Sequence, residues 1–130
     1  MDDRAIVVDE LDVPPTRWSD ETRGEVQFRT LIGDGRTPTH SLTAGVTEMK
    51  PGDWLGHHRH EPAEVYYVLE GEGTMTLSGE EVAVAAGSAV FIPGSLEHGI
   101  RNTGKGPLRF FYTFAVDRLD DVDYHFSVDE

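Results

Sequence analysis

The chain has 130 residues, no cysteine and a formal net charge of -13 from 24 acidic and 11 basic side chains. This length predicts one domain whose core needs no disulfides, and the lack of thiols excludes cysteine nucleophiles and thiolate metal sites. The negative charge argues against nucleic acids and anionic membranes as partners. Since no segment has the pattern of a signal peptide or of a bilayer-spanning run, we expect a soluble, cytoplasmic protein.

Short segments in which apolar and polar residues alternate are expected to form β-strands along most of the chain. Residues 5–8 are apolar and are interpreted as an edge strand, whereas 16–24 is polar and indicates at most a helical turn from Ser19. The other predicted strands are 26–32, 40–49, 74–77, 81–84, 89–92, 96–101 and 108–116. Turns rich in glycine and proline separate them, and no long amphipathic helical pattern occurs, so an all-β barrel or sandwich is predicted.

Residues 52–71 carry the main chemical feature of the sequence. His58 and His60 are two residues apart, so their side chains share one face of a strand. Glu64 joins them if the chain keeps strand parity, while His57 faces the opposite side. Two imidazoles and one carboxylate that converge form a set of metal ligands with coordination positions left open for a substrate.

The spacing of this stretch, G(x)5HxH(x)3E(x)6G, resembles the first of the two motifs of the cupin superfamily. The second cupin motif, G(x)5PxG(x)2H(x)3N, is matched by Gly87, Pro93, His98 and Asn102. One position departs from it, because the glycine stands at Gly94 and the pattern expects it at Ser95. This departure affects the turn before His98 and no expected ligand.

The resemblance implies the cupin double-stranded β-helix, a jelly-roll barrel, as a single domain over residues 1–130. The barrel itself is expected over about 25–116, with an N-terminal edge segment and the C-terminal tail packed on it. The ligands that the resemblance implies are His58, His60, Glu64 and His98. This donor set suits one divalent transition metal, namely Fe, Mn, Ni or Zn. The remaining histidines are interpreted as non-ligands and are His40, His57 and His125.

Within the superfamily, the chain is most similar to the small cupin lyases that cleave dimethylsulfoniopropionate into dimethyl sulfide and acrylate. The similar stretches are 62–68, 94–105 and 110–126. In those enzymes the tyrosine two residues beyond the glutamate removes a proton next to the carboxylate, and Tyr66 stands at that position here. A second tyrosine from the C-terminal segment lines their pocket, and Tyr124 takes its place. Strand parity also points Tyr66 inward and Tyr67 outward, and a nearby cation can lower the pKa of a tyrosine.

Two other functions stay open at this stage because one barrel serves many reactions. An Fe(II) dioxygenase of a small organic acid or diketone would use the same four ligands without a tyrosine base. A non-catalytic cupin that binds a metal or a small molecule needs no base either. The favoured interpretation is that the protein is an enzyme, namely the lyase, and that its substrate is a small carboxylate-bearing molecule. The resemblance also implies a homodimer.

Overall fold

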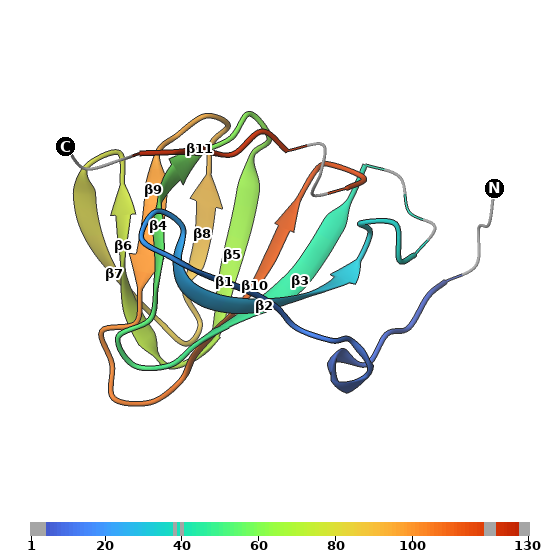
Figure 1. Ribbon diagram of the computed structural model, residues 1–130, viewed down its shortest axis with the longest axis horizontal. Helices are drawn as coiled ribbons and strands as arrows, with labels where there is room; N and C mark the ends of the chain where they lie inside the picture. The colour runs from blue at the N-terminus through green and yellow to red at the C-terminus, as the bar shows by residue number, and fades with distance from the viewer. Residues whose placement is uncertain (1–4, 38, 40, 119–121, 128–130) are drawn as a thin grey trace.

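The computed structural model describes residues 5–37, 39, 41–118 and 122–127, which form β-strands joined by short turns (Figure 1). One 3-10 helix, η1 (Glu10–Asp12), precedes the strands. The strands are β1 (Thr16–Asp20), β2 (Gly24–Ile32), β3 (Thr43–Met49), β4 (Trp54–Arg59), β5 (Glu64–Glu70), β6 (Glu72–Leu77), β7 (Glu80–Ala85), β8 (Ala89–Ile92), β9 (His98–Arg101), β10 (Leu108–Phe114) and β11 (His125–Phe126). No helix in the described ranges is long and apolar enough to span a membrane.

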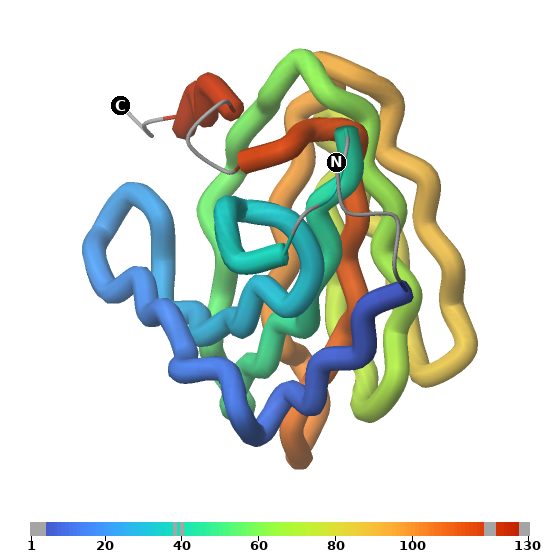
Figure 2. Tube along the Cα trace, turned by 90° about the vertical axis from the view of Figure 1, so that its right-hand side faces the viewer, coloured from blue at the N-terminus to red at the C-terminus, as the bar shows by residue number. Residues whose placement is uncertain are grey.

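The strands form one 11-stranded antiparallel sheet that curls upon itself (Figure 2). Its main order is β7-β6-β9-β4-β2-β3-β10-β5-β8, with β1 added to β2 and β11 to β4. Buried residues from both halves of this order, such as Met75 of β6 and Val68 of β5, belong to one core. The sheet therefore encloses a single interior, and the predicted all-β jelly-roll fold is confirmed.

The core consists of the inward positions of strands that alternate between buried and exposed residues. Along β10, Leu108, Phe110, Tyr112 and Phe114 are buried while the residues between them are half-exposed. Phe110 is only 1% exposed, and burying a large apolar side chain of this kind contributes about 1.5–3 kcal/mol. The interior end of β10 that carries Tyr112 and Phe114 also carries the candidate site.

The N-terminal region differs from the sequence-based prediction in two places. Residues 5–8 form no strand, since Val7 is 96% exposed and finds no apolar surface to cover. Residues 16–20 form β1 in place of the expected polar turn, because Trp18 lies opposite Val26 and packs its indole on Phe28. Asp20 then accepts hydrogen bonds from the backbone of the following turn, which closes the hairpin to β2.

The C-terminal segment lies across the open end of the barrel. Strand β10 ends at Phe114, two residues before the predicted end at 116. After an interval, Val122 is buried, and β11 pairs with β4 so that Phe126 lies opposite His58. The aromatic rings of the tail thereby pack on His58 of β4 and on His60 just beyond it.

The turn before β9 shows why the cupin pattern expects glycine at the position of Ser95. The Leu96 amide donates to the Pro93 carbonyl over 3.2 Å, and Ser95, the third residue of this turn, has a φ of 65°. A turn of this type requires a positive φ at its third position and therefore favours glycine there.

Ser95→Gly is therefore expected to raise the free energy of unfolding by about 1 kcal/mol, since it removes the strain of a β-carbon in the left-handed region. Urea unfolding at neutral pH measures the change. Gly94→Ala is the matched control, because its new Cβ would lie 2.3 Å from the Glu61 carbonyl oxygen and must destabilise the protein. A loss of stability in Ser95→Gly would contradict this explanation of the turn.

Candidate metal centre

Three histidines from two parts of the chain meet inside the barrel. His58 lies on β4 opposite His98 at the start of β9, and His60 follows just beyond the end of β4. Each is at most 3% exposed. One ring nitrogen from each residue lies within 4.8 Å of the others. The structure thus brings together the three histidines that the sequence predicted, and this buried cluster could hold a metal ion.

The backbone fixes the orientation of all three imidazoles. The Nδ1 atom of each ring lies 2.7–2.8 Å from a carbonyl oxygen two residues away along the chain. The carbonyls belong to Gly56 for His58, Pro62 for His60 and Leu96 for His98. A carbonyl can only accept, so each Nδ1 donates, and in its neutral form each ring keeps the Nε2 lone pair for another partner. When neutral, the rings are therefore held ready to bind a cation through Nε2.

Glu64, at the start of β5, adds a carboxylate to the histidine cluster. Its Oε1 atom lies 3.1 Å from His60 Nε2 and 3.5 Å from His98 Nε2. Within the described residues, His98 Nε2 is a buried nitrogen without a hydrogen-bond partner. A buried polar atom left unpaired is costly, and a metal ion bound to the three nitrogens would satisfy it. The donor set therefore fits a transition metal that accepts imidazole and carboxylate ligands.

The electrostatics of the site favour neutral imidazole at His58 and charge at Glu64. Burial, together with the neighbouring His98, lowers the pKa of His58 to about 3. Burial opposes the charge of Glu64, but contacts with His60 and His98 outweigh it and lower the pKa of the carboxyl. Burial likewise opposes a proton on His60, but the Glu64 carboxylate outweighs this effect and raises the pKa of His60. At neutral pH the site therefore presents an ionised carboxylate.

The metal-free protein is expected to lose stability as the pH falls from 6.5 to 4.5. In this window His58 becomes protonated in the unfolded chain but stays neutral in the folded protein, because its folded pKa is about 3. The free energy of unfolding therefore falls by up to about 1.4 kcal/mol per pH unit. His60 causes no loss of stability in this window, because a group with a raised pKa stabilises the fold fully below its ordinary pKa of 6.5. Glu64, with a lowered pKa, reduces the stability only near and below pH 4.5. Urea unfolding in the presence of a chelator should show a flatter pH dependence for His58→Leu. Equal slopes would contradict the prediction.

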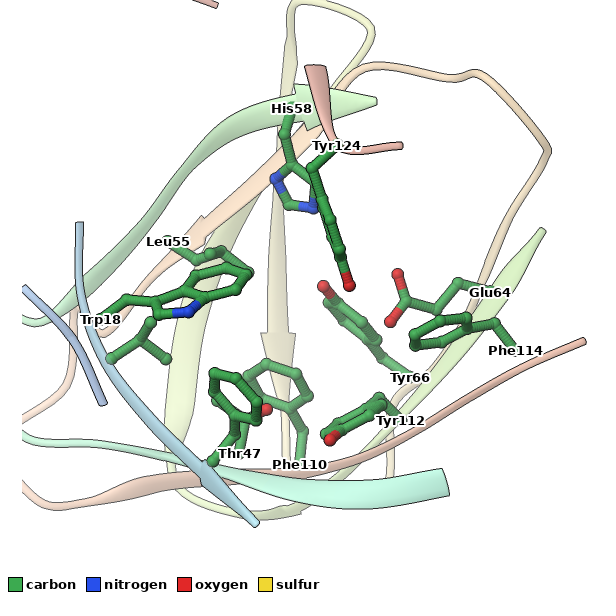
Figure 3. A pocket seen from close by; sticks show the side chains of 12 residues that line it. Trp18, Thr47, Leu55, His58, Glu64, Tyr66, Phe110, Tyr112, Phe114 and Tyr124 are labelled. Carbon is green, nitrogen blue, oxygen red and sulfur yellow. The ribbon is translucent and has the colours of Figure 1, made fainter. Parts of the chain in front are cut away.

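A small cavity adjoins the histidine cluster on its inner side (Figure 3). It offers ≈ 40 Å³ to the centre of a water molecule. Figure 3 shows the Tyr124 hydroxyl pointing toward the Glu64 carboxylate and the Tyr66 hydroxyl pointing into the cavity beside it. Burial raises the pKa of both tyrosines. Each hydroxyl is therefore protonated at neutral pH unless a positive charge lies close to it.

The other residues that the sequence analysis placed lie away from the cavity. His57 and His125 are exposed, and Tyr67 is 44% exposed on the outer side of β5. His40 lies outside the described residues. The outward positions of His57 and Tyr67 follow directly from strand alternation, as predicted.

Tyr112 and Trp18 are among the cavity residues that the sequence analysis did not assign to the site. Tyr112 lines the cavity, and its hydroxyl lies 2.7 Å from Thr30 Oγ1. Its inward position was available from the alternation of 108–116, because Phe110 and Phe114 share its face. Trp18 also lines the cavity. It stands in a polar stretch without a strand pattern, so its placement depended on the pairing of β1 with β2.

Comparison with known proteins agrees with the fold and the site. Residues 45–114 match the family model described as a cupin domain. The chain is 40% identical to the dimethylsulfoniopropionate lyase DddW of Ruegeria pomeroyi, over 92% of this chain and 78% of that protein. It is 32% identical to an oxalate-binding protein of Thermotoga maritima, over 81% of this chain and 89% of the relative.

A solved structure extends the similarity to nearly the whole chain. The polyketide cyclase RemF from Streptomyces resistomycificus superposes with a TM-score of 0.81 and 25% identity, covering 98% of this chain and 88% of that one. The match therefore includes the strands at both ends of the fold as well as the central motifs. Together with the family match, these similarities show that the chain belongs to the cupin domain family.

Proposed function

We propose that this protein is a metal-dependent lyase that cleaves dimethylsulfoniopropionate into dimethyl sulfide and acrylate. The observation that carries the proposal is the 40% identity with a lyase of this substrate over 92% of the chain. The geometry supports it, since the buried histidine cluster and the hydroxyl of Tyr66 face the same small cavity. A compact substrate suits this cavity, whereas a sugar or a large aromatic molecule does not.

The reaction in this proposal is a β-elimination. A base removes a proton from the carbon next to the carboxylate, and the released electron pair forms the carbon–carbon double bond. The carbon–sulfur bond breaks, its electron pair leaves with dimethyl sulfide, and acrylate remains. We assign the base to Tyr66 in its phenolate form, which the positive charge of a bound metal ion would favour, and give Tyr124 the opposite wall of the cavity, where it holds the substrate against the base and excludes water.

His58, His60, Glu64 and His98 are the residues that would hold the metal in this proposal. The bound ion would supply positive charge that binds the substrate carboxylate and stabilises the negative charge that develops as the proton leaves. Fe, Mn, Ni and Zn all accept this donor set. The chain itself contributes the fixed imidazole orientations and the enclosed, largely apolar surroundings.

The direct test is the release of dimethyl sulfide from dimethylsulfoniopropionate by purified protein loaded in turn with Fe, Mn, Ni and Zn. Headspace gas chromatography should detect the gas and liquid chromatography an equal amount of acrylate. Protein that has bound metal but yields neither product with any of the four ions would exclude the lyase. Oxygen uptake by the iron-loaded protein with a small organic acid would instead support the dioxygenase.

A non-catalytic binder of a small carboxylate is the second candidate. It is favoured by the 32% identity with an oxalate-binding protein over most of both chains. Calorimetric titration with oxalate distinguishes it, because a binder would take up oxalate tightly without turning over dimethylsulfoniopropionate. The homodimer and the cytoplasmic location stay predictions.

A further inference from the structure

The cavity beside the histidine cluster is walled mainly by aromatic rings. Seven of its lining residues are aromatic, and they are Trp18, Phe28, Tyr66, Phe110, Tyr112, Phe114 and Tyr124. The described lining residues include one carboxylate, Glu64, and neither lysine nor arginine. Glu64 lies at the histidine end of the cavity (Figure 3), and Tyr124 extends from that end, where it contacts His60, toward Trp18. Beyond it the cavity is lined by electron-rich rings with no cationic side chain among the described lining residues.

We propose that Trp18, Phe28, Tyr112 and Tyr124 form an aromatic wall that binds the cationic end of the substrate. These residues thereby select a substrate with an onium group over a neutral molecule of the same shape. The inference rests on the proposed function, because it takes the substrate carboxylate to lie at the histidine cluster. It adds the residues that recognise the other end of the molecule.

The rings of the aromatic wall hold one another at fixed angles. The Trp18 ring centroid lies 5.2 Å from that of Phe28 and 5.7 Å from that of Tyr124, with interplanar angles of 78° and 87°. Phe28 meets Tyr112 in the same edge-to-face manner at 6.5 Å. Rings packed at near right angles present faces in several directions, and a ring face attracts a cation through its quadrupole.

Trp18 is already engaged with one cation of the protein. The guanidinium carbon of Arg23 lies 5.0 Å from the Trp18 ring centroid. Arg23 also forms an ion pair of 2.6 Å with Asp20, which reduces its repulsion toward a second cation. The indole therefore keeps its attraction for an onium group that enters from the cavity.

Most of the aromatic wall lies outside the part of the chain that matches the cupin domain. Trp18 lies on β1 and Phe28 on β2, both outside residues 45–114 that match the cupin domain. Tyr124 lies on the C-terminal segment, also outside that range. Tyr112 lies inside that range, so the proposed selectivity for a cation is carried mostly, but not wholly, by segments outside the one that holds the metal-binding motifs.

The test compares two ligands that differ in one charge. N,N-dimethyl-β-alanine carries a protonated amine at neutral pH. Its isostere 4-methylpentanoate has the same carboxylate but an uncharged CH group in place of the ammonium. Isothermal titration calorimetry on the metal-loaded full-length protein gives both affinities. A desolvated cation–π contact predicts that the cation binds about 10- to 30-fold more tightly than the neutral isostere.

Variants of Trp18 and Trp54 test whether the preference for the cationic ligand depends on Trp18. Trp18→Leu should bring the two affinities within about threefold of each other, and Trp18→Phe should give an intermediate ratio because Trp attracts a cation best. Trp54→Leu is the control, since Trp54 lines a different groove outside the barrel, and it should keep the full ratio. If Trp18→Leu does not fold, Trp18→Phe alone must lower the ratio.

The outcomes separate this inference from the proposed function. A wild-type protein that binds neither ligand, binds both equally, or keeps its preference in the Trp18 variants overturns the aromatic wall. A preference that depends on Trp18 without any release of dimethyl sulfide overturns the lyase and leaves the wall in place. Release of dimethyl sulfide, together with a preference for the cation that the Trp18 variants do not change, supports the lyase and overturns the aromatic wall.

Discussion

His98→Ala is expected to lower the affinity of the protein for a divalent metal by about 100-fold or more. The substitution removes one of the three imidazole nitrogens that lie within 4.8 Å of one another, and even residues that only orient a ligand cost about 10- to 100-fold when replaced. Competition with a chelating dye measures the affinity, and elemental analysis gives the metal content of the purified protein. His58→Ala, which removes the partner of His98 across β4 and β9, should behave in the same way.

The control for this experiment is His57→Ala. His57 is the direct neighbour of His58 but is exposed on the outer side of β4, so its loss should leave metal content and affinity unchanged. Circular dichroism of the metal-free variants separates a lost ligand from a lost fold. A folded His98→Ala protein that retains wild-type metal affinity would show that the cluster is not the metal site.

Tyr66→Phe is expected to lower kcat for cleavage of dimethylsulfoniopropionate by about 10²- to 10⁴-fold, the usual contribution of a general base. The hydroxyl is the only group removed, and Tyr66 is 2% exposed and stacks its ring on Phe110 at 4.4 Å. Phenylalanine can keep this packing, so metal content and thermal stability should stay close to those of the wild type. A lower kcat with little change in substrate affinity identifies a group that acts in the transition state.

Tyr67→Phe is the matched control on the same strand. Its hydroxyl lies on the outer side of β5, where the side chain is 44% exposed, so activity should not change. A Tyr66→Phe protein that keeps more than about a tenth of the wild-type rate would contradict the assignment of the base. In an oxygenase or a binder, the same substitution would have a much weaker effect.

Much of the site could be predicted from the sequence because its ligands lie close together in the chain. His58 and His60 share a face through strand alternation alone. Glu64 meets them in the fold, but residues 60–63 lie between β4 and β5, so strand parity does not place it there. His98 is 38 residues beyond His60 by the numbering of the chain, so its place depended on the resemblance to a known pair of motifs. The pairing of β4 with β9 then confirmed that it meets His58.

The sequence was less informative where a segment has no periodic pattern of its own. Residues 5–8 are apolar but form no strand, although Ile6 and Val8 are half-buried, whereas the polar 16–20 becomes a strand through its partner β2. Thr43 and Thr47 are buried inside the barrel even though they are the polar members of their strand. In each case, contacts with residues distant in the chain outweigh the local preference.

The sequence by itself determined the all-β class, the two motifs, the three histidines and the inward direction of Tyr66. Only the tertiary structure decided that three backbone carbonyls orient the imidazoles and that Trp18 helps to wall the cavity, whereas Tyr124 was expected to line it from the resemblance. The physical reason is that alternation specifies which way a side chain points from its own strand. Which side chains it meets there depends on how strands far apart in the chain pair and curl around one interior.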